Sequence, residues 1–388
     1  MNKFLVFSLS IVLFIQFNIP KVEAQQEVVL PNILSESAIL IDATTGEVLL
    51  EKKPKKVMYP ASLTKVATAI YAIERGNLDD IVTVSQNSNG TGGSSVYLEE
   101  GEQVKLKTLI QGLLVNSGND AGVAIAEHLD GSVEKFSSNI NQYLKNTIGI
   151  NTTNFMNPHG LFDPKHTTTA SDLAKITQYA MQNGIFKDIF GMKQLEWNGL
   201  SWNTTLYTHH KLMREVPYDG INGGKTGYVN ESGFTLITTA ERENISLIAV
   251  VLKGSQPTAY NDTTKLLDYG FKNFETSKIA KGKEYVNVLG ERYEVPNDLF
   301  FTNRIGEEIV PDILTNGKLV INQQKSKFNS TFELKKKIEE VEEIQPELLV
   351  EETVAESDND GNFLIKLIKK VISYIFNLGE KVESVLNS

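Results

Sequence analysis

The chain has 388 residues, 41% of them apolar, and it carries a formal net charge of −10 with no cysteine. This length and apolar content predict about two domains with additional segments, and the missing cysteines exclude disulfides and a lipid-modified cysteine. The charge is local, because residues 338–361 contain eight glutamates and two aspartates but no lysine or arginine. The rest of the chain therefore sums to zero, which does not indicate nucleic acid as a partner.

Residues 1–24 read as a secretory signal peptide. Lys3 precedes an apolar stretch from Phe4 to Ile15, and Val22-Glu23-Ala24 resembles a cleavage site before Gln25. The alternative is a retained membrane anchor. Either interpretation predicts an exported protein.

Residues 25–277 are predicted to form an α+β body. Segments 37–42 and 46–50 form a hairpin around a short turn, and strands near Thr235 and Ile248 are expected to join it in one antiparallel sheet. Helices are expected to cover this sheet near residues 62–75, 105–115 and 120–129.

The first chemical signal is Ser62-Leu63-Thr64-Lys65, which follows Tyr59-Pro60-Ala61 and opens an apolar helix. A spacing of three residues puts Ser62 and Lys65 on one helix face, where their side chains can touch. A lysine that burial or a nearby positive charge keeps neutral can take the serine proton. The start of a helix also favours the negative charge that develops on a substrate oxygen during attack.

Two further strings complete a serine acyl-transfer site that needs no catalytic histidine. Ser117-Gly118-Asn119 falls between two predicted helices, so a loop can present its side chains to a cleft. Lys225-Thr226-Gly227 precedes a predicted hairpin of residues 233–239 and 245–252. A strand edge there offers free N–H and C=O groups for an extended peptide.

Similar strings elsewhere are predicted to have no catalytic role. Ser132-Val133-Glu134-Lys135 follows a helix-ending Asp130-Gly131 turn, and Ser357-Asp358-Asn359 lies in the acidic segment. The histidines show no metal-ligand spacing, and H-E-x-x-H is absent, so neither a zinc peptidase nor any other metal site is expected.

The C-terminal part consists of three segments that differ in composition. Residues 278–337 alternate short strand-like runs with turns and predict a small all-β domain. Residues 338–361 are interpreted as an acidic linker, with a short helix from Glu333 to Glu343 at its start. Residues 362–388 repeat apolar side chains at steps of three and four, which predicts an amphipathic helix that lies on a membrane. The alternative is a helix docked on the body or on another subunit.

The order S-x-x-K, S-G-N, K-T-G, together with Asn157-Pro158-His159-Gly160-Leu161, resembles the low-molecular-weight penicillin-binding proteins, which are serine D-alanyl-D-alanine carboxypeptidases of peptidase family S11. The resemblance covers roughly residues 34–275. It implies a β-lactamase/transpeptidase-like fold. The chain departs from the family pattern at Gly223-Gly224, where a bulkier residue is common, and at Tyr228, where a histidine is sometimes found.

The resemblance also implies roles for individual residues. Ser62 would be the acylated nucleophile, Lys65 its base, and Ser117 a proton relay to the leaving D-alanine. Asn119 would hold the peptide, and Lys225-Thr226-Gly227 would bind its terminal carboxylate. The backbone N–H groups of Ser62 and Tyr228 would form the oxyanion hole.

These roles predict a carboxypeptidase that trims D-alanine from peptidoglycan stem peptides during cell-wall maturation and is acylated by β-lactams. No cofactor is expected. Residues 362–388 would hold it on the outer face of the bacterial cytoplasmic membrane. A D,D-endopeptidase, a β-lactamase and a penicillin-binding sensor that stays acylated remain alternatives.

Overall fold

The computed structural model describes residues 29–323, 328–337 and 368–373. The chain divides into two compact units, Met1–Lys335 and Lys336–Ser388. The predicted signal peptide, the acidic linker and most of the terminal helix lie outside the described residues.

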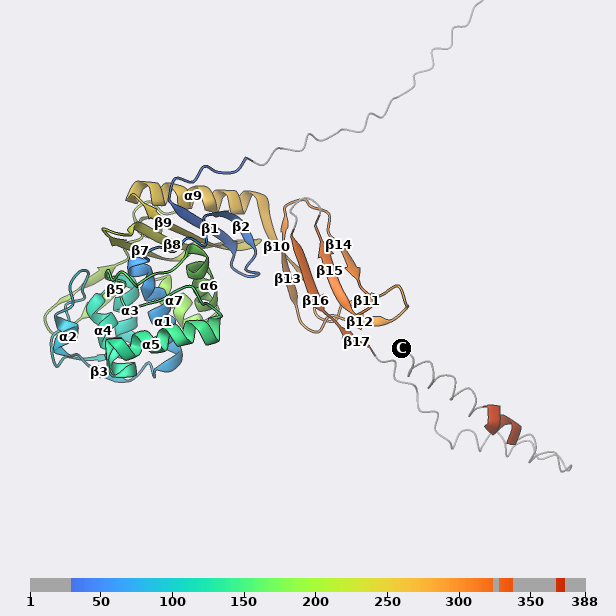
Figure 1. The fold of residues 1–388 in the computed structure, drawn as a ribbon, viewed down its shortest axis with the longest axis horizontal. Coiled ribbons are helices and arrows are strands. Elements are labelled where there is room, and N and C mark those ends of the chain that lie inside the picture. The colour runs from blue at the N-terminus through green and yellow to red at the C-terminus, as the bar shows by residue number, and fades with distance from the viewer. Residues whose placement is uncertain (1–28, 324–327, 338–367, 374–388) are drawn as a thin grey trace, which may run out of the picture. The chain divides into compact units, whose positions relative to one another are not determined.

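A five-stranded antiparallel sheet forms the centre of the first unit, with the strand order β2-β1-β9-β8-β7 (Figure 1). Both predicted hairpins are confirmed, because β1 pairs with β2 and β8 pairs with β9, and β1 joins them through β9. The α+β fold class is therefore confirmed. The strands of this sheet are β1 (Ser37–Asp42), β2 (Val48–Lys52), β7 (Ile221–Val229), β8 (Gly233–Arg242) and β9 (Ile245–Gly254).

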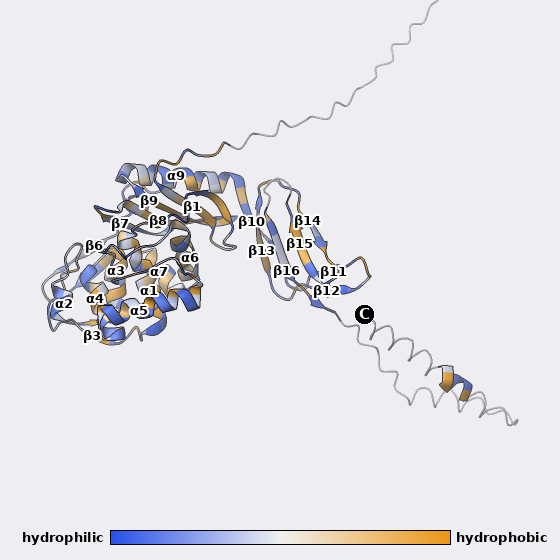
Figure 2. Cartoon of the chain, viewed as in Figure 1, coloured by the Kyte–Doolittle hydropathy of each residue, from blue (hydrophilic) through white to orange (hydrophobic). Residues whose placement is uncertain are grey.

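Successive side chains along the central strands enter two different cores. In β1, Ile39 and Ile41 join one buried cluster, while Ala38 and Leu40 join the other. Side chains of a strand alternate between the faces of its sheet, so an uninterrupted apolar run indicates burial on both faces. The apolar colouring of these strands is visible in Figure 2.

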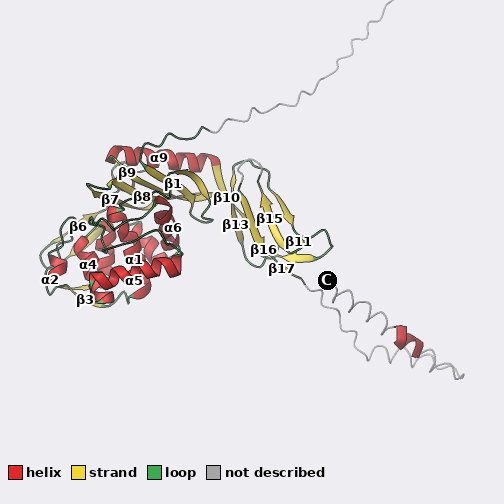
Figure 3. Cartoon of the chain, viewed as in Figure 1, coloured by secondary structure: helices red, strands yellow, loops and turns green. Residues whose placement is uncertain are grey.

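Helices cover both faces of the sheet (Figure 3). Helix α9 packs on β8 and β9, and α6 contacts β1 and β9. The three helices predicted near residues 62–75, 105–115 and 120–129 are confirmed as α1, α3 and α4. The helices are α1 (Thr64–Arg75), α2 (Gln86–Asn89), α3 (Leu106–Val115), α4 (Asn119–Asp130), α5 (Val133–Tyr143), α6 (Ala170–Met181), α7 (Gly184–Phe190), α8 (Lys211–Arg214) and α9 (Gln256–Asn273).

Two short antiparallel pairs of strands from the helical part also lie outside the central sheet. Strand β3 pairs with β4, and β5 pairs with β6. Their bounds are Ile81–Thr83, Gln103–Lys105, Gln194–Asn198 and Asn203–Tyr207. Neither pair was predicted from the sequence.

All elements described between Phe274 and Lys336 are strands, and a third buried cluster holds them together. Strand β10 continues across the expected boundary at 277/278, and the division into domains there stays a prediction. The strands are β10 (Phe274–Ile279), β11 (Glu284–Val286), β12 (Arg292–Glu294), β13 (Leu299–Arg304), β14 (Val310–Ile313), β15 (Lys318–Asn322), β16 (Asn329–Glu333) and β17 (Lys335–Lys336).

The helix predicted to begin at Glu333 is wrong at its start. Glu333 ends strand β16, which pairs with β15, and Lys335 and Lys336 are also extended. Phe332 and Leu334 pack against the third cluster, so burial of these side chains outweighs local helix preference.

Residues 368–373 are helical and exposed. This short helical turn agrees with the helix predicted for residues 362–388. The other residues of that segment lie outside the described ranges. Within the described ranges, no helix has the length and apolar character needed to cross a bilayer.

Candidate active site

Ser62 lies in a short 3₁₀ turn, Ala61–Leu63, that leads directly into α1. The regular helix was expected to open at Ser62 and instead begins at Thr64. Ala61 adopts a left-handed φ of 50°, which is strained for a residue with a side chain. The turn is held by hydrogen bonds from Thr64 Oγ1 to the Ala61 carbonyl (2.8 Å) and from Thr235 Oγ1 to the Pro60 carbonyl (3.0 Å). Tertiary contacts therefore fix the backbone around Ser62.

The Lys65 amine has three polar neighbours. Its Nζ lies 2.9 Å from Ser62 Oγ, 2.7 Å from Asn119 Oδ1 and 2.7 Å from the carbonyl oxygen of His159. The orientation of the Asn119 amide is defined, because its Nδ2 donates to the carbonyl of Gly92 at 2.7 Å. Two of the three neighbours can thus only accept a hydrogen bond. A neutral amine has two N–H donors and one lone pair, so the lone pair is left to face the Ser62 hydroxyl.

The surroundings favour this neutral form. Lys65 is fully buried, and burial holds the pKa of its amine well below the usual value. The positive charge of Lys225 lowers this pKa further, while the carboxylate of Asp120 opposes the shift. The geometry at Lys65 and the direction of its pKa shift are those that a general base requires.

Ser117 occupies the turn between α3 and α4 with a left-handed φ of 62°, and it is almost completely buried. Asn119 begins α4 and contacts Lys65, so the structure brings the first two strings together. Both ends of the Asn119 amide are already bonded to protein groups. Its role in holding the peptide stays a prediction, while its contact with Lys65 is observed.

The Asn157–Leu161 string places the His159 carbonyl against the amine of Lys65. The N–H of Gly160 donates to Asn157 Oδ1 at 2.7 Å, and Gly160 has φ of 88°. A Cβ on Gly160 would lie 1.8 Å from the Ala61 carbonyl oxygen, so only glycine fits. Burial lowers the pKa of His159 to about 3, and its ring accepts a hydrogen bond from the Leu161 N–H. These contacts indicate a structural role for this histidine.

The third string lies on β7, one of the two edge strands of the sheet. Lys225 is buried, its Nζ donates to the Thr226 carbonyl at 2.9 Å, and burial lowers its pKa to about 7. A Cβ on Gly227 would lie 2.9 Å from Ser62 N, so the glycine allows β7 to pack directly against the turn that holds Ser62. Tyr228 follows on the same strand with an exposed side chain. The predicted edge-strand site is thus assembled beside Ser62.

The structure explains the departure at Gly223-Gly224. A Cβ on Gly223 would lie 2.4 Å from the ring of Phe190, and one on Gly224 would lie 2.4 Å from the ring of His210. His210 is buried, and burial lowers its pKa to about 3. Two rings packed against β7 therefore occupy the space that larger side chains would need.

The two similar strings, at Ser132 and Ser357, were predicted to have no catalytic role, and the structure describes the first of them. The Ser132 side chain caps α5 by accepting a hydrogen bond from the N–H of Lys135 at 3.2 Å. Ser357-Asp358-Asn359 lies outside the described residues. Capping is an ordinary structural role for a serine.

Asp120 also supports the site, although the sequence pattern did not identify it. Asp120 is buried at the start of α4, where its carboxylate accepts hydrogen bonds from the Val96 and Leu98 N–H groups and from the Ser95 hydroxyl. It thereby ties the 95–98 loop to the Ser117-Gly118-Asn119 string. A carboxylate in the first turn of an apolar helix was the available signal.

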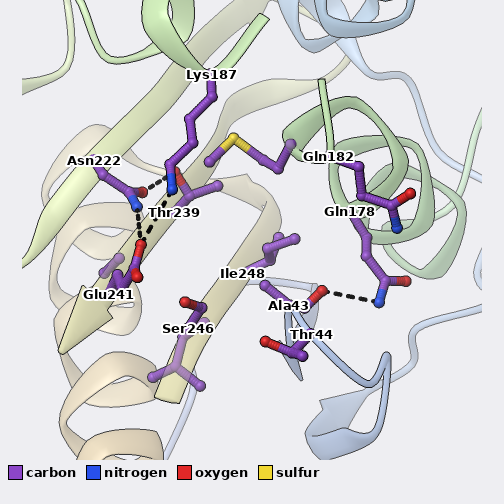
Figure 4. Close-up of a pocket in the computed structure, with 13 residues that line it drawn as sticks. Ala43, Thr44, Gln178, Gln182, Lys187, Asn222, Thr239, Glu241, Ser246 and Ile248 are labelled. Atoms are coloured by element: carbon purple, nitrogen blue, oxygen red, sulfur yellow. Dashed lines mark hydrogen bonds and ion pairs between the residues drawn. The ribbon is translucent and has the colours of Figure 1, made fainter. Parts of the chain in front are cut away.

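A separate pocket of about 260 Å³ lies near the β1–β2 turn and contains none of the three strings (Figure 4). Its polar groups bond to one another. Lys187 pairs with Glu241 at 3.3 Å, Asn222 Nδ2 donates to Glu241 at 3.2 Å, and Gln178 Nε2 donates to the Ala43 carbonyl at 3.0 Å. The three strings assembled around Ser62 are therefore the stronger candidate site.

Comparison with known proteins identifies relatives of this site. Residues 22–256 match the family model described as D-alanyl-D-alanine carboxypeptidase, Peptidase_S11. The chain is 34% identical over 262 residues to D-alanyl-D-alanine carboxypeptidase DacF of Bacillus subtilis, covering 65% of this chain and 66% of the relative. It is 33% identical over 307 residues to D-alanyl-D-alanine carboxypeptidase DacA of Haemophilus influenzae, covering 72% and 73%.

A solved structure shows the same architecture. Penicillin binding protein 5 from Haemophilus influenzae superposes with a TM-score of 0.70 at 28% identity, covering 79% of this chain and 98% of that one. The similarity therefore extends beyond the residues that the family model matches.

Proposed function

This chain belongs to the D-alanyl-D-alanine carboxypeptidase family of serine peptidases, and on that premise we propose that it removes the terminal D-alanine from peptidoglycan stem peptides through an acyl-enzyme on Ser62. One observation supports this most directly. Lys65 Nζ lies 2.9 Å from Ser62 Oγ, and two groups that can only accept a hydrogen bond lie 2.7 Å from the same amine.

The reaction begins when Ser62 Oγ attacks the carbonyl carbon before the terminal D-alanine and its proton passes to Lys65 Nζ. The N–H groups of Ser62 and Tyr228 stabilise the oxyanion. As the intermediate collapses, the C–N bond breaks and the proton passes through Ser117 to the leaving amine. Water then attacks the ester with Lys65 again as base, which releases the shortened peptide and restores Ser62.

Lys225 and Thr226 would bind the free carboxylate of the substrate. A bound carboxylate favours the charged form of Lys225, whose pKa is about 7 in the free protein. We expect Lys225→Ala to lower kcat/KM roughly 10- to 100-fold for a peptide ending in a free carboxylate, because a hydrogen bond between charged groups is lost. The same peptide with an amidated terminus, which lacks that charge, should be affected far less. Steady-state release of the terminal residue measures both.

Lys253→Ala is the matched control, because Lys253 is an exposed lysine that pairs with Glu36. It should leave both substrates unaffected. Equal losses for the free and the amidated peptide in Lys225→Ala would exclude the carboxylate role.

Single-turnover and steady-state measurements separate this activity from its alternatives. A D,D-endopeptidase would prefer cross-linked peptides, and a β-lactamase would hydrolyse penicillin rapidly. A sensor would acylate and remain acylated. Release of D-alanine with turnover from a monomeric stem peptide supports the carboxypeptidase.

Localisation belongs to the same proposal. Residues 1–24 would direct export, and residues 362–388 would hold the enzyme on the outer face of the cytoplasmic membrane. Ile368, Val371 and Ile372 are each about half exposed in the described turn of helix, which supports an apolar face available for a bilayer.

Removal of residues 362–388 is expected to release the protein from anionic vesicles without changing turnover of a soluble peptide, because the proposed chemistry lies before Val229. Binding of the intact protein should weaken with salt, since each lysine near an anionic surface contributes about 1 kcal/mol. Ile368→Glu together with Ile375→Glu should release it at any salt, because burial of the apolar face is the larger contribution. Vesicle co-sedimentation measures both effects.

The control is Val310→Glu, an exposed apolar position on β14. It should leave vesicle binding unchanged. A truncated enzyme that stays on vesicles, or that loses activity toward the soluble peptide, would show that the helix belongs to the catalytic body.

A further inference from the structure

Two aromatic rings form an exposed pair near the Ser117-Gly118-Asn119 string. The rings of Tyr97 and Trp202 meet edge to face, with centroids 4.8 Å apart and an interplanar angle of 86°. Tyr97 is 59% exposed, while Trp202 is half-buried against the main core. Leu200, beside Trp202 in the β5–β6 turn, is also exposed. Such a patch leaves a large apolar surface in water, which is typical of a binding site.

The backbone of Tyr97 is held in a strained conformation. Its φ is 59°, in the left-handed region that bulky residues rarely adopt. The N–H groups of both neighbours, Val96 and Leu98, donate to the carboxylate of Asp120 at 3.1 Å. The Tyr97 carbonyl accepts a hydrogen bond from Ser201 Oγ at 2.9 Å. Strain that the surrounding structure maintains at an exposed ring indicates a function for that ring.

The same loop is bonded directly to the catalytic string. The Asn119 N–H donates to the Ser94 carbonyl at 2.7 Å, and Asn119 Nδ2 donates to the Gly92 carbonyl at 2.7 Å. Asn119 in turn contacts Lys65. Tyr97 is therefore held on a loop that is bonded to Asn119, which contacts Lys65, and Trp202 joins it from the β5–β6 turn.

We propose that the Tyr97–Trp202 pair binds sugar rings of the glycan to which the stem peptide is attached. This proposal rests on the proposed function, because that substrate joins a peptide to a sugar chain. A pyranose has an apolar face of C–H groups and a polar edge of hydroxyls. The C–H face packs on the electron-rich face of an aromatic ring, while the hydroxyls stay in water. An open, rigid pair of rings suits such a ligand better than it suits an extended peptide.

The test uses Tyr97→Gly, because glycine adopts the left-handed φ without strain and removes only the ring. Two substrates with the same pentapeptide are compared, one free and one attached to its disaccharide. KM for the disaccharide substrate should rise about two- to tenfold, the range expected for one aromatic stacking contact. Turnover of the free peptide should stay unchanged. Tyr97→Phe, which keeps the ring, should behave as the unmodified protein does.

Phe300→Ala, which removes an exposed ring on β13, is the control and should change neither substrate. Equal losses for both substrates in Tyr97→Gly would mean that the residue acts through the loop on Asn119, and would overturn the sugar site. No change for the disaccharide substrate would overturn it as well.

A binding measurement keeps this proposal separate from the proposed function. Of the two tryptophans in the chain, Trp197 is buried, so N-acetylglucosamine oligomers should alter the emission of Trp202. The titration is made on the Ser62→Ala protein, with Trp202→Phe as the blank, and Tyr97→Gly should weaken it. A response with no peptide turnover in the unmodified enzyme would retain the sugar site and reject the carboxypeptidase. Peptide turnover without a change in Trp202 emission would reject the sugar site and retain the carboxypeptidase.

Discussion

Replacement of Ser62 by alanine is expected to abolish covalent labelling by a fluorescent penicillin and to reduce D-alanine release by a factor on the order of 10⁴ or more. The hydroxyl is the only group of this residue that can form the acyl-enzyme. Its turn is held by backbone and threonine contacts that the substitution leaves in place. Gel fluorescence and D-alanine assays measure the loss, and circular dichroism checks the fold.

Ser132→Ala is the matched control, since Ser132 also stands three residues before a lysine. Labelling should remain complete, with a stability loss of about 1 kcal/mol from the lost helix cap. Labelling that persists in a folded Ser62→Ala protein would refute the assignment of the nucleophile.

Lys65→Ala should slow acylation by penicillin roughly 10²- to 10⁴-fold, the usual contribution of a general base. In the unmodified enzyme, the rate should fall as pH falls through the depressed pKa of Lys65, because protonation removes the lone pair that accepts the Ser62 proton. The variant should lack this acidic limb. Stopped-flow acylation across the pH range measures both.

The acylation rate at alkaline pH tests the role of Lys225 in the same experiment. Lys225 loses its charge as pH rises through about 7, so carboxylate ligands should bind more weakly above that pH. Lys105→Ala, an exposed lysine paired with Asp79, should retain both limbs. An acidic limb that survives in Lys65→Ala would assign the base to another group.

The sequence predicted the parts of the fold that local pattern determines. The apolar run of β1 indicated a strand, and the spacing of Ser62 and Lys65 placed them on one helix face. The third partner of Lys65, the His159 carbonyl, depends on a loop position that Gly160 makes possible through its approach to Ala61. A close approach between segments that are distant in the chain produces no periodic pattern in the sequence, so it could not be predicted.

The incorrect helix start at Glu333 has a related cause. Local composition there favours a helix, whereas pairing with β15 and burial of Phe332 favour a strand. The strained φ of Tyr97 is also set by neighbours, through Asp120, and its own residue type would argue against it. Tertiary contacts decided each of these positions.

The two buried lysines also affect how the folded state responds to protons. An unfolded chain would bind a proton at Lys225 up to about pH 10.4, whereas the folded protein releases it near 7. Between these values the unfolded state holds more protons, so folding stability is gained as pH rises and is lost as pH falls toward 7. At neutral pH this difference costs on the order of 4 kcal/mol for Lys225 alone. The free energy that offsets the burial of these two amines is thus supplied by the two hydrophobic cores packed on either side of the sheet.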